Sequence, residues 1–177
     1  MRYRRAKTPG GTYFFTVNLA ERKRTLLVDY IDDLRTVVKK VQTAHPFHID
    51  AMVVLPDYLH AMWTLAEGDA DYPMRWSLIK AGFSRRIPNG ERRNPSRMAK
   101  GERGIWQRRY WEHLIRDDRD FERHADYIHD NPVKHGYVPR IRDWPYSSFH
   151  RYVRNGMYRE DWGGGGDSAQ TGGFGER

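Results

Sequence analysis

Cysteine is absent from the 177-residue sequence, which excludes disulfide bonds, thiolate zinc sites and cysteine nucleophiles and suits a reducing compartment. Long apolar runs are also absent, so no segment has the length needed to span a bilayer. The charged start, MRYRRAKTPGG, is not followed by the apolar segment of a signal peptide. These absences predict a cytoplasmic protein without a membrane partner. The 38% of apolar residues are enough for one domain with a core.

Acidic residues are scarce in the middle of the chain. Residues 75–109 contain eleven Lys or Arg and only two acidic residues, while the whole chain has a net charge of +8. Aromatic residues lie among these charges, and such a surface attracts phosphates and lets single-stranded bases stack. A solvated charged surface is the plainer alternative. We predict nucleic-acid contacts by basic residues in this segment and at the start of the chain: Arg4, Arg5, Lys80, Arg85, Arg86, Arg92, Arg93, Arg108 and Arg109.

Hydrophobic periodicity predicts the elements in the order β-α-β-β-α-β-α. The expected strands are 12–19, 47–55, 58–65 and 106–116, the expected helices are 28–44, 73–87 and 117–131, and 89–103 is expected to be a loop. This order predicts an α+β fold with a ferredoxin-like split βαβ core, in which an antiparallel sheet carries helices on one face, plus a C-terminal helix. We expect a single domain over 1–162 and a disordered, glycine-rich tail over 163–177.

Two short stretches contain polar residues that could carry chemistry. In VLPDYLHAMW, Tyr58 and His60 are two apart on a predicted strand and share a face, so they could be a ligand pair, half of one, or neither. Tyr127 and Asn131 are four apart on the C-terminal helix and also share a face. The plain interpretation makes Tyr127 a half-buried aromatic and Asn131 a helix C-cap. Tyrosine is an uncommon nucleophile because its phenol is protonated at neutral pH.

Four blocks of the sequence together resemble the REP-associated tyrosine transposases, a branch of the one-tyrosine HUH transposases that act on single-stranded DNA. They are VLPDYLHAMW, GIWQRRYWEHLIRDDRDF, YIHDNPVKHGYV and DWPYSSFHRYV. The resemblance implies the ferredoxin-like fold and a metal-dependent endonuclease and strand-transferase in the bacterial cytoplasm, at the nucleoid. Its partner would be single-stranded or hairpin DNA of REP palindromes, cut through a 5′-phosphotyrosine intermediate.

The resemblance also implies roles for individual residues. Tyr127 would be the nucleophile, and Lys134 is a plausible phosphate contact. A Mg²⁺ or Mn²⁺ ion would be held at the positions of Tyr58, His60 and Asn131. The family has a histidine where this sequence has Tyr58, and a neutral phenol is a poor ligand for these ions. Ionising a phenol with a pKa of about 10 costs roughly 4 kcal/mol at pH 7, so we expect Tyr58 to weaken metal binding and cleavage while DNA binding survives.

Other interpretations remain open at this point. A catalytically impaired protein that binds the same hairpins without cutting is the main rival, and an RNA-binding ferredoxin-like domain is a weaker one. We expect His129 to be a surface or DNA-contacting residue, and His113 to be a hydrogen-bonded strand histidine. A monomer is expected, although related transposases often act as dimers.

Overall fold

The computed structural model describes residues 7–163 of the chain. The predicted DNA contacts Arg4 and Arg5 lie outside the described residues, and so does the predicted tail from residue 164 onward. Nothing in the structure therefore tests those two expectations or the proposed domain boundary. Within the described part, no helix is long and apolar enough to cross a membrane.

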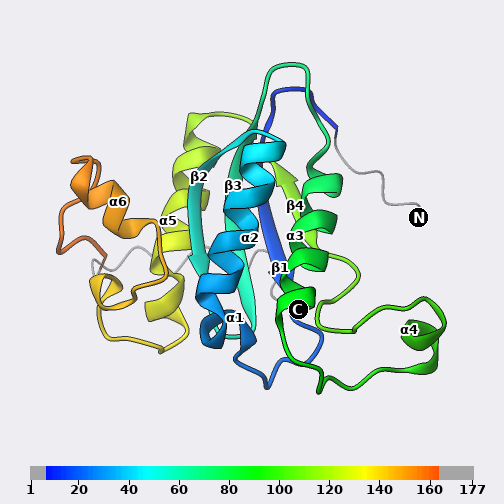
Figure 1. Cartoon of the computed structure of the whole chain (residues 1–177). Coiled ribbons are helices and arrows are strands. Elements are labelled where there is room, and N and C mark those ends of the chain that lie inside the picture. The colour runs from blue at the N-terminus through cyan, green and yellow to red at the C-terminus, as the bar shows by residue number, and fades with distance from the viewer. Residues whose placement is uncertain (1–6, 164–177) are drawn as a thin grey trace, which may run out of the picture.

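One four-stranded antiparallel sheet organises the molecule (Figure 1). Its strands are β1 (Thr12–Asn18), β2 (Phe47–Val54), β3 (Tyr58–Leu65) and β4 (Trp111–Leu114). The strand order β2-β3-β1-β4 is that of the split βαβ plan, with both βαβ crossovers skipping a neighbouring strand. The predicted ferredoxin-like α+β class is confirmed.

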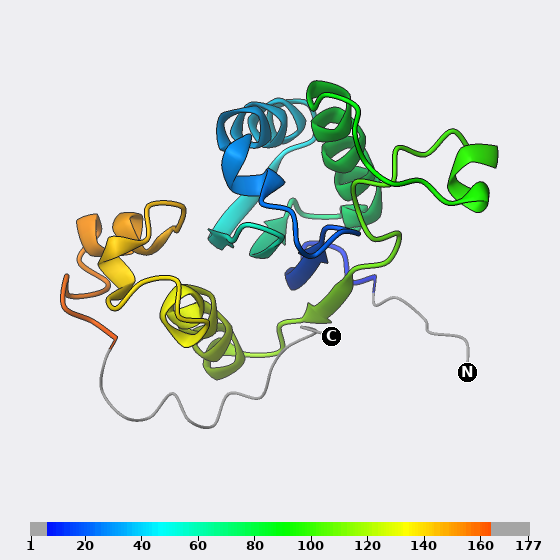
Figure 2. The same ribbon diagram turned by 90° about the horizontal axis from the view of Figure 1, so that it is seen from below.

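Helices α1 (Leu26–Asp29), α2 (Ile31–Ala44) and α3 (Tyr72–Arg86) cover one face of the sheet (Figures 1 and 2). Large aromatic side chains fill the space between them, and the Trp63 and Trp76 rings stack with their centroids 4.2 Å apart. The predicted single helix over 28–44 is wrong at its start. Tyr30 has φ −116° and ψ 37°, outside helical geometry, because it turns the chain while packing against this core.

Helix α5 (Asp118–Lys134) covers the opposite face of the sheet. It begins as predicted, because the Asp117 side chain accepts a hydrogen bond from the backbone N–H of Asp120. The predicted end at 131 is wrong: Pro132 lies inside the helix. Proline disfavours helical geometry in the residue before it, but Asn131 is held there by a tertiary hydrogen bond from Tyr58, described below.

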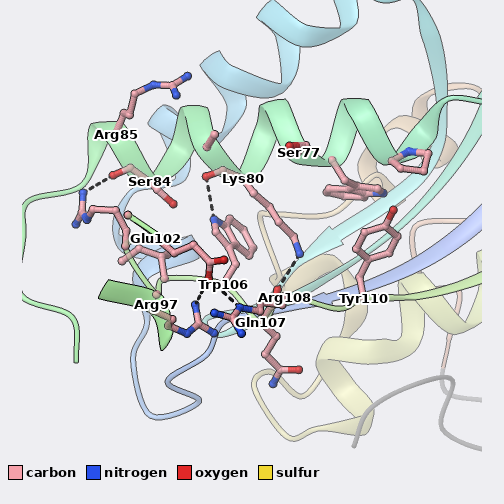
Figure 3. Close-up of a pocket in the computed structure, with 17 residues that line it drawn as sticks. Ser77, Lys80, Ser84, Arg85, Arg97, Glu102, Trp106, Gln107, Arg108 and Tyr110 are labelled. Carbon is pink, nitrogen blue, oxygen red and sulfur yellow. Dashed lines mark hydrogen bonds and ion pairs between the residues drawn. The ribbon is translucent and has the colours of Figure 1, made fainter. Parts of the chain in front are cut away.

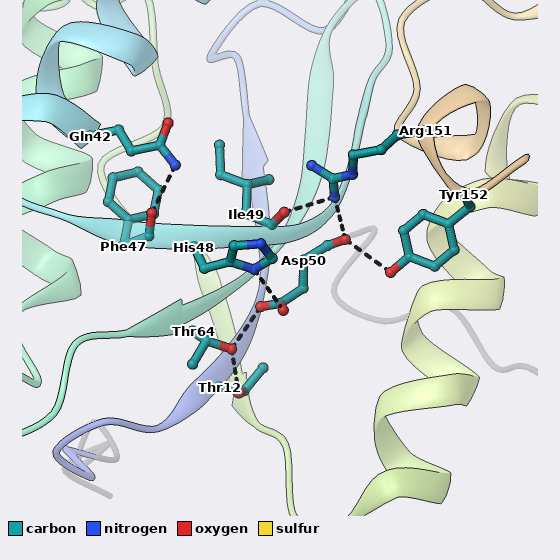
Figure 4. Close-up of polar contacts among 9 residues, drawn as sticks. All are labelled: Thr12, Gln42, Phe47, His48, Ile49, Asp50, Thr64, Arg151 and Tyr152. Atoms are coloured by element: carbon teal, nitrogen blue, oxygen red, sulfur yellow. Dashed lines mark hydrogen bonds and ion pairs between the residues drawn. The ribbon is translucent and has the colours of Figure 1, made fainter. Parts of the chain in front are cut away.

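The segment after α5 closes the exposed edge of β2. It contains a 3₁₀ helix, η1 (Ile141–Asp143), and α6 (Phe149–Arg154), neither of which the sequence pattern predicted. The pairing of β2 with β3 is irregular between Ile49 and Ala51, and the carbonyls of Ile49 and Asp50 bond to α6 there. Arg151 donates to both carbonyls at 2.8 and 2.6 Å, and the Tyr152 hydroxyl donates to that of Asp50 at 2.9 Å (Figure 4). These bonds fix α6 beside the sheet.

The basic segment between α3 and β4 is only partly irregular. The predicted loop over 89–103 contains α4 (Pro95–Ala99), which Asn94 caps by accepting from the N–H of Arg97. The predicted strand over 106–116 is wrong at both ends, because only 111–114 join the sheet. Trp106 makes one isolated bridge to Leu19, and its indole instead packs against α3 and donates to the Lys80 carbonyl.

Candidate active site and nucleic-acid interface

The face of the sheet beneath α5 brings together the four residues singled out from the two sequence stretches. Strand β3 supplies Tyr58 and His60, and α5 supplies Tyr127 and Asn131. The ring centroid of His60 lies 5.2 Å from that of Tyr58 and 5.3 Å from that of Tyr127. The Tyr58 hydroxyl donates to the Asn131 amide oxygen at 2.9 Å. The two residues that share a face of β3 and the two that share a face of α5 therefore meet at one site.

Strand β1 fixes the His60 ring from below. Thr16 is paired with His60 across the β1–β3 ladder, and its hydroxyl lies 2.9 Å from Nδ1 of the imidazole. The Phe14 ring stacks on the imidazole with a centroid separation of 5.3 Å. The histidine is fully buried. A hydroxyl on one ring nitrogen sets the orientation of the ring, as outer partners do for histidines that bind metals or protons.

The three predicted ligands do not fit a Mg²⁺ or Mn²⁺ ion as they stand. These ions favour carboxylate and other oxygen ligands, whereas this set has one imidazole, one neutral phenol, and an amide oxygen that accepts from that phenol. Two cationic side chains also lie beside the set, of which Arg22 is ion-paired with Asp57. The guanidinium of Arg22 lies 5.1 Å from the Tyr58 ring centroid, and the Lys134 ammonium lies 4.6 Å from that of Tyr127.

Asn131 and Tyr127 both differ from their plain interpretation. Asn131 is not a C-cap: it is fully buried inside α5, and the cap residue is His135. Tyr127 is not half-buried, because only 2% of its surface is exposed, with Phe14 edge-on at 6.1 Å. Tyr127 is therefore a core residue of this face rather than a half-buried one.

The expectation that His129 lies on the surface or contacts DNA is wrong. The side chain is fully buried between α5 and α6, where Nε2 lies 2.8 Å from the Ser148 hydroxyl and the ring meets Tyr152 edge-on at 4.5 Å. Burial lowers the pKa of His129 to about 3, so the ring is neutral. Its role is to join the two helices. His113 is hydrogen-bonded as predicted, with Nε2 2.8 Å from an Asp120 carboxylate oxygen.

A basic and aromatic pocket of about 650 Å³ lies between α3 and residues 101–110 (Figure 3). Lys80 crosses it, donating to the Gln107 carbonyl at 2.9 Å and lying 5.1 Å from the Tyr110 ring centroid. Trp76 and Trp106 form part of its wall. Of the predicted nucleic-acid contacts, this pocket gathers Lys80, Arg85 and Arg108, and it adds Arg97, which sequence reasoning did not single out.

Acidic side chains neutralise some of the predicted phosphate contacts. Arg86 is paired with Asp33 at 3.0 Å and Arg108 with Glu102 at 2.9 Å. Arg85 and Arg109 are exposed and make no ion pair with any residue that the structure describes. Arg92 and Arg93 are exposed as well and make no ion pair within the described residues; they line a second hollow of about 480 Å³ beside α4, which shares Arg97 and Gly104 with the first pocket. By this criterion Arg85, Arg92, Arg93 and Arg109 are the better candidates for phosphate contacts within the set.

Known proteins resemble this chain both in sequence and in structure. A Haemophilus influenzae protein provisionally named a REP-associated tyrosine transposase is 49% identical over 166 residues, covering 93% of this chain and 94% of that protein. The Escherichia coli REP-associated tyrosine transposase is 47% identical over 162 residues, covering 92% and 90%. A solved structure of a REP-associated tyrosine transposase bound to a REP hairpin superposes with a TM-score of 0.85 at 45% identity, covering 100% of this chain and 98% of that one. No protein-family model matches the chain.

Proposed function

Because this chain belongs to the REP-associated tyrosine transposase family, we propose that it binds REP-type hairpin DNA and cuts the adjoining single strand through Tyr127. The hairpin in the solved relative supports the choice of DNA partner. The exposed cations of the basic segment support binding to a phosphate backbone. The RNA-binding alternative has no comparable support.

Tyr127 is suited to this role by its neighbours. In the proposed step the phenol loses its proton, its oxygen bonds to the scissile phosphorus, and the 3′ oxygen leaves and takes up a proton. The product is a 5′-phosphotyrosine and a free 3′-hydroxyl, which can attack in reverse without an energy cofactor. The Lys134 ammonium beside the Tyr127 ring can hold a phosphate oxygen while this exchange takes place.

One observation carries the rest of the proposal: the Tyr58 hydroxyl is bonded to the Asn131 amide oxygen. The family's divalent ion would need that oxygen and an imidazole at position 58, so Tyr58 both removes one ligand and engages another. We therefore propose that cleavage is slow and that hairpin binding is unaffected, because residue 58 is buried and the exposed cations lie elsewhere.

The test uses the full chain and a labelled REP-like hairpin with a single-stranded extension, with Mn²⁺ present. Binding is followed by fluorescence anisotropy, and cleavage by the covalent protein–DNA adduct on denaturing gels. We expect Tyr58→His to raise adduct formation at least tenfold with unchanged affinity. Tyr127→Phe should abolish the adduct and keep binding, and Tyr137→Phe, at an exposed tyrosine, is the matched control.

The outcomes separate the proposal from its rival. If neither wild type nor Tyr58→His forms an adduct while both bind the hairpin, the chain is a hairpin-binding protein without nuclease activity. If Tyr127→Phe still forms the adduct, Tyr127 is not the nucleophile. If wild type binds the hairpin no better than an unstructured strand of the same composition, the proposed partner is wrong.

A further inference from the structure

A second cluster of ligand-type side chains lies at the other end of the face that α5 covers. Strand β4 supplies His113, and the first turns of α5 supply Asp120 and His124. One ligand atom from each residue lies within 4.8 Å of the other two. His113 Nε2 is 2.8 Å and His124 Nδ1 is 3.2 Å from the two oxygens of the Asp120 carboxylate.

The cluster is distinct from the site around His60. Phe14 separates the two, with its ring stacked on His60 on one side and 4.9 Å from His124 on the other. Along α5, His124 lies three residues before Tyr127, and Asn131 lies four residues after it. The two sites therefore flank Tyr127, each about one helical turn away.

The donor set suits a transition metal better than it suits Mg²⁺. Two imidazoles and one carboxylate are a common ligand set for Zn²⁺, which leaves a fourth position open. With bonds of about 2.0 to 2.1 Å, tetrahedral ligand atoms lie about 3.3 Å apart. The two imidazole–carboxylate separations, 2.8 and 3.2 Å, are already close to this value, and all three ligand atoms lie within 4.8 Å of one another. Asp120 and His124 are four apart on the helix and face the same way, and their side chains are almost fully buried.

We propose that His113, Asp120 and His124 bind a divalent transition metal of the Zn²⁺ class. Binding requires His124 to give up the hydrogen bond that its Nδ1 donates to the Asp120 carbonyl at 2.7 Å, by moving that proton to Nε2. The two imidazoles, now stacked with their centroids 4.7 Å apart, must also turn toward one point. The carboxylate can keep its contact with the backbone N–H of Arg116 at 3.1 Å. Entry is from the β4 side, where the His113 side chain is 25% exposed. The ion would join β4 to the start of α5 and so hold in place the helix that carries Tyr127.

The test is metal binding by the full chain, stripped with EDTA and titrated with Zn²⁺ or, for its visible spectrum, Co²⁺. We expect one equivalent to bind, with the intense visible absorption of tetrahedral Co²⁺. At a hundredfold excess of Zn²⁺ over Kd, the melting temperature should rise by about 5 to 10 °C. His113→Gln should weaken binding at least about tenfold, since even partners of a ligand cost 10- to 100-fold.

Two matched variants locate the ion. His48→Gln removes an exposed histidine that also has an aspartate partner, Asp50, at 3.0 Å, and His60→Gln removes the imidazole of the other site. Both should bind Zn²⁺ like wild type. Wild type that fails to bind at micromolar Zn²⁺, binding that persists in folded His113→Gln, or binding lost in His60→Gln would each overturn the proposal.

A measurement on wild type alone guards against a variant that fails to fold. The imidazole ¹⁵N resonances of His113 and His124 should shift on addition of Zn²⁺, while that of His60 should not. Shifts confined to other histidines would also overturn the proposal. None of these readouts depends on DNA cleavage, so they stand or fall separately from the function proposed above.

Discussion

At the scale of single residues, the site depends on a contact that no sequence pattern contains. Strand period predicts that Tyr58 and His60 share a face, and helix period predicts the same for Tyr127 and Asn131. Neither periodicity predicts that the face of β3 and the face of α5 contact each other, because that contact depends on how α5 lies on the sheet. The resemblance to a known family supplied that link. The structure then added the bond between the Tyr58 hydroxyl and the Asn131 amide oxygen.

That bond makes a prediction about stability. Tyr58→Phe removes the donor of this buried hydrogen bond, which should cost about 0.5 to 1.5 kcal/mol. Urea unfolding of the full chain measures the change in the free energy of unfolding. Tyr137→Phe, at an exposed tyrosine, is the control and should change it by less than about 0.5 kcal/mol. Equal effects of the two variants would mean that the bond contributes nothing.

The lowered pKa of Asp120 predicts how the stability of the fold depends on pH. Burial opposes its ionisation, but hydrogen bonds from His113 and from the Arg116 N–H prevail and lower its pKa from 3.8 to about 2. A carboxyl with a lowered pKa stabilises the fold above its unfolded value and loses that contribution as pH falls through the folded value. The contribution of Asp120 should therefore fall by about 2 kcal/mol between pH 5 and pH 2. The wild type should lose more than this, because Glu91, whose pKa Arg103 lowers to about 2, titrates in the same range.

The contribution of Asp120 is isolated by comparing variants in the same metal-free buffers. Asp120→Asn should be the less stable chain at pH 5 and should lose less stability than wild type on acidification. Asp118→Asn, at an exposed position of the same turn, should follow the wild-type profile. An unchanged profile for Asp120→Asn, measured by urea unfolding at each pH, would contradict the prediction.

At the scale of elements, the features that depend on neighbouring residues were predicted correctly from the sequence. The β3 bounds, the Asp117 cap and the strand order of the sheet follow from period, capping chemistry and connection rules. The misplaced boundaries have tertiary causes. Pro132 was expected to end α5, but the hydrogen bond from Tyr58 holds Asn131, the residue before it, in helical geometry. Trp106 was expected in a strand, but its indole packs on α3. Helix α6 depends on carbonyls exposed at an irregularity in β2, which no nearby residue signals.

The caps of two helices should differ in their importance to the whole fold. Asp117→Ala removes the cap of α5, which packs Ala125, Tyr127 and Ile128 into the core on its face of the sheet, and should cost about 1 kcal/mol of unfolding free energy. Asn94→Ala removes the same kind of cap from α4, which has no buried residues. We expect no measurable change there, because α4 can fray without opening the core. Equilibrium unfolding in urea compares the two, and similar losses would refute the distinction.

At the scale of the whole molecule, the distribution of charge should govern affinity for DNA. The net charge of +8 predicts that hairpin binding weakens steeply with salt, because each neutralised phosphate releases counterions. Arg85 and Arg109 lie exposed on the basic segment, whereas Arg86 is already paired with Asp33. Phosphate binding by Arg86 would have to break that ion pair, and this removes part of the gain.

A salt titration of three variants tests this reasoning. Arg85→Ser and Arg109→Ser should each weaken hairpin binding several-fold and lower the slope of log K against log salt by about 0.7 to 0.9, the loss of one phosphate contact. Arg86→Ser is the matched control beside Arg85 and should change the slope little. Fluorescence anisotropy from 50 to 300 mM salt gives the slopes. If Arg86→Ser lowers the slope as much as Arg85→Ser does, ion pairing within the chain does not select the phosphate contacts.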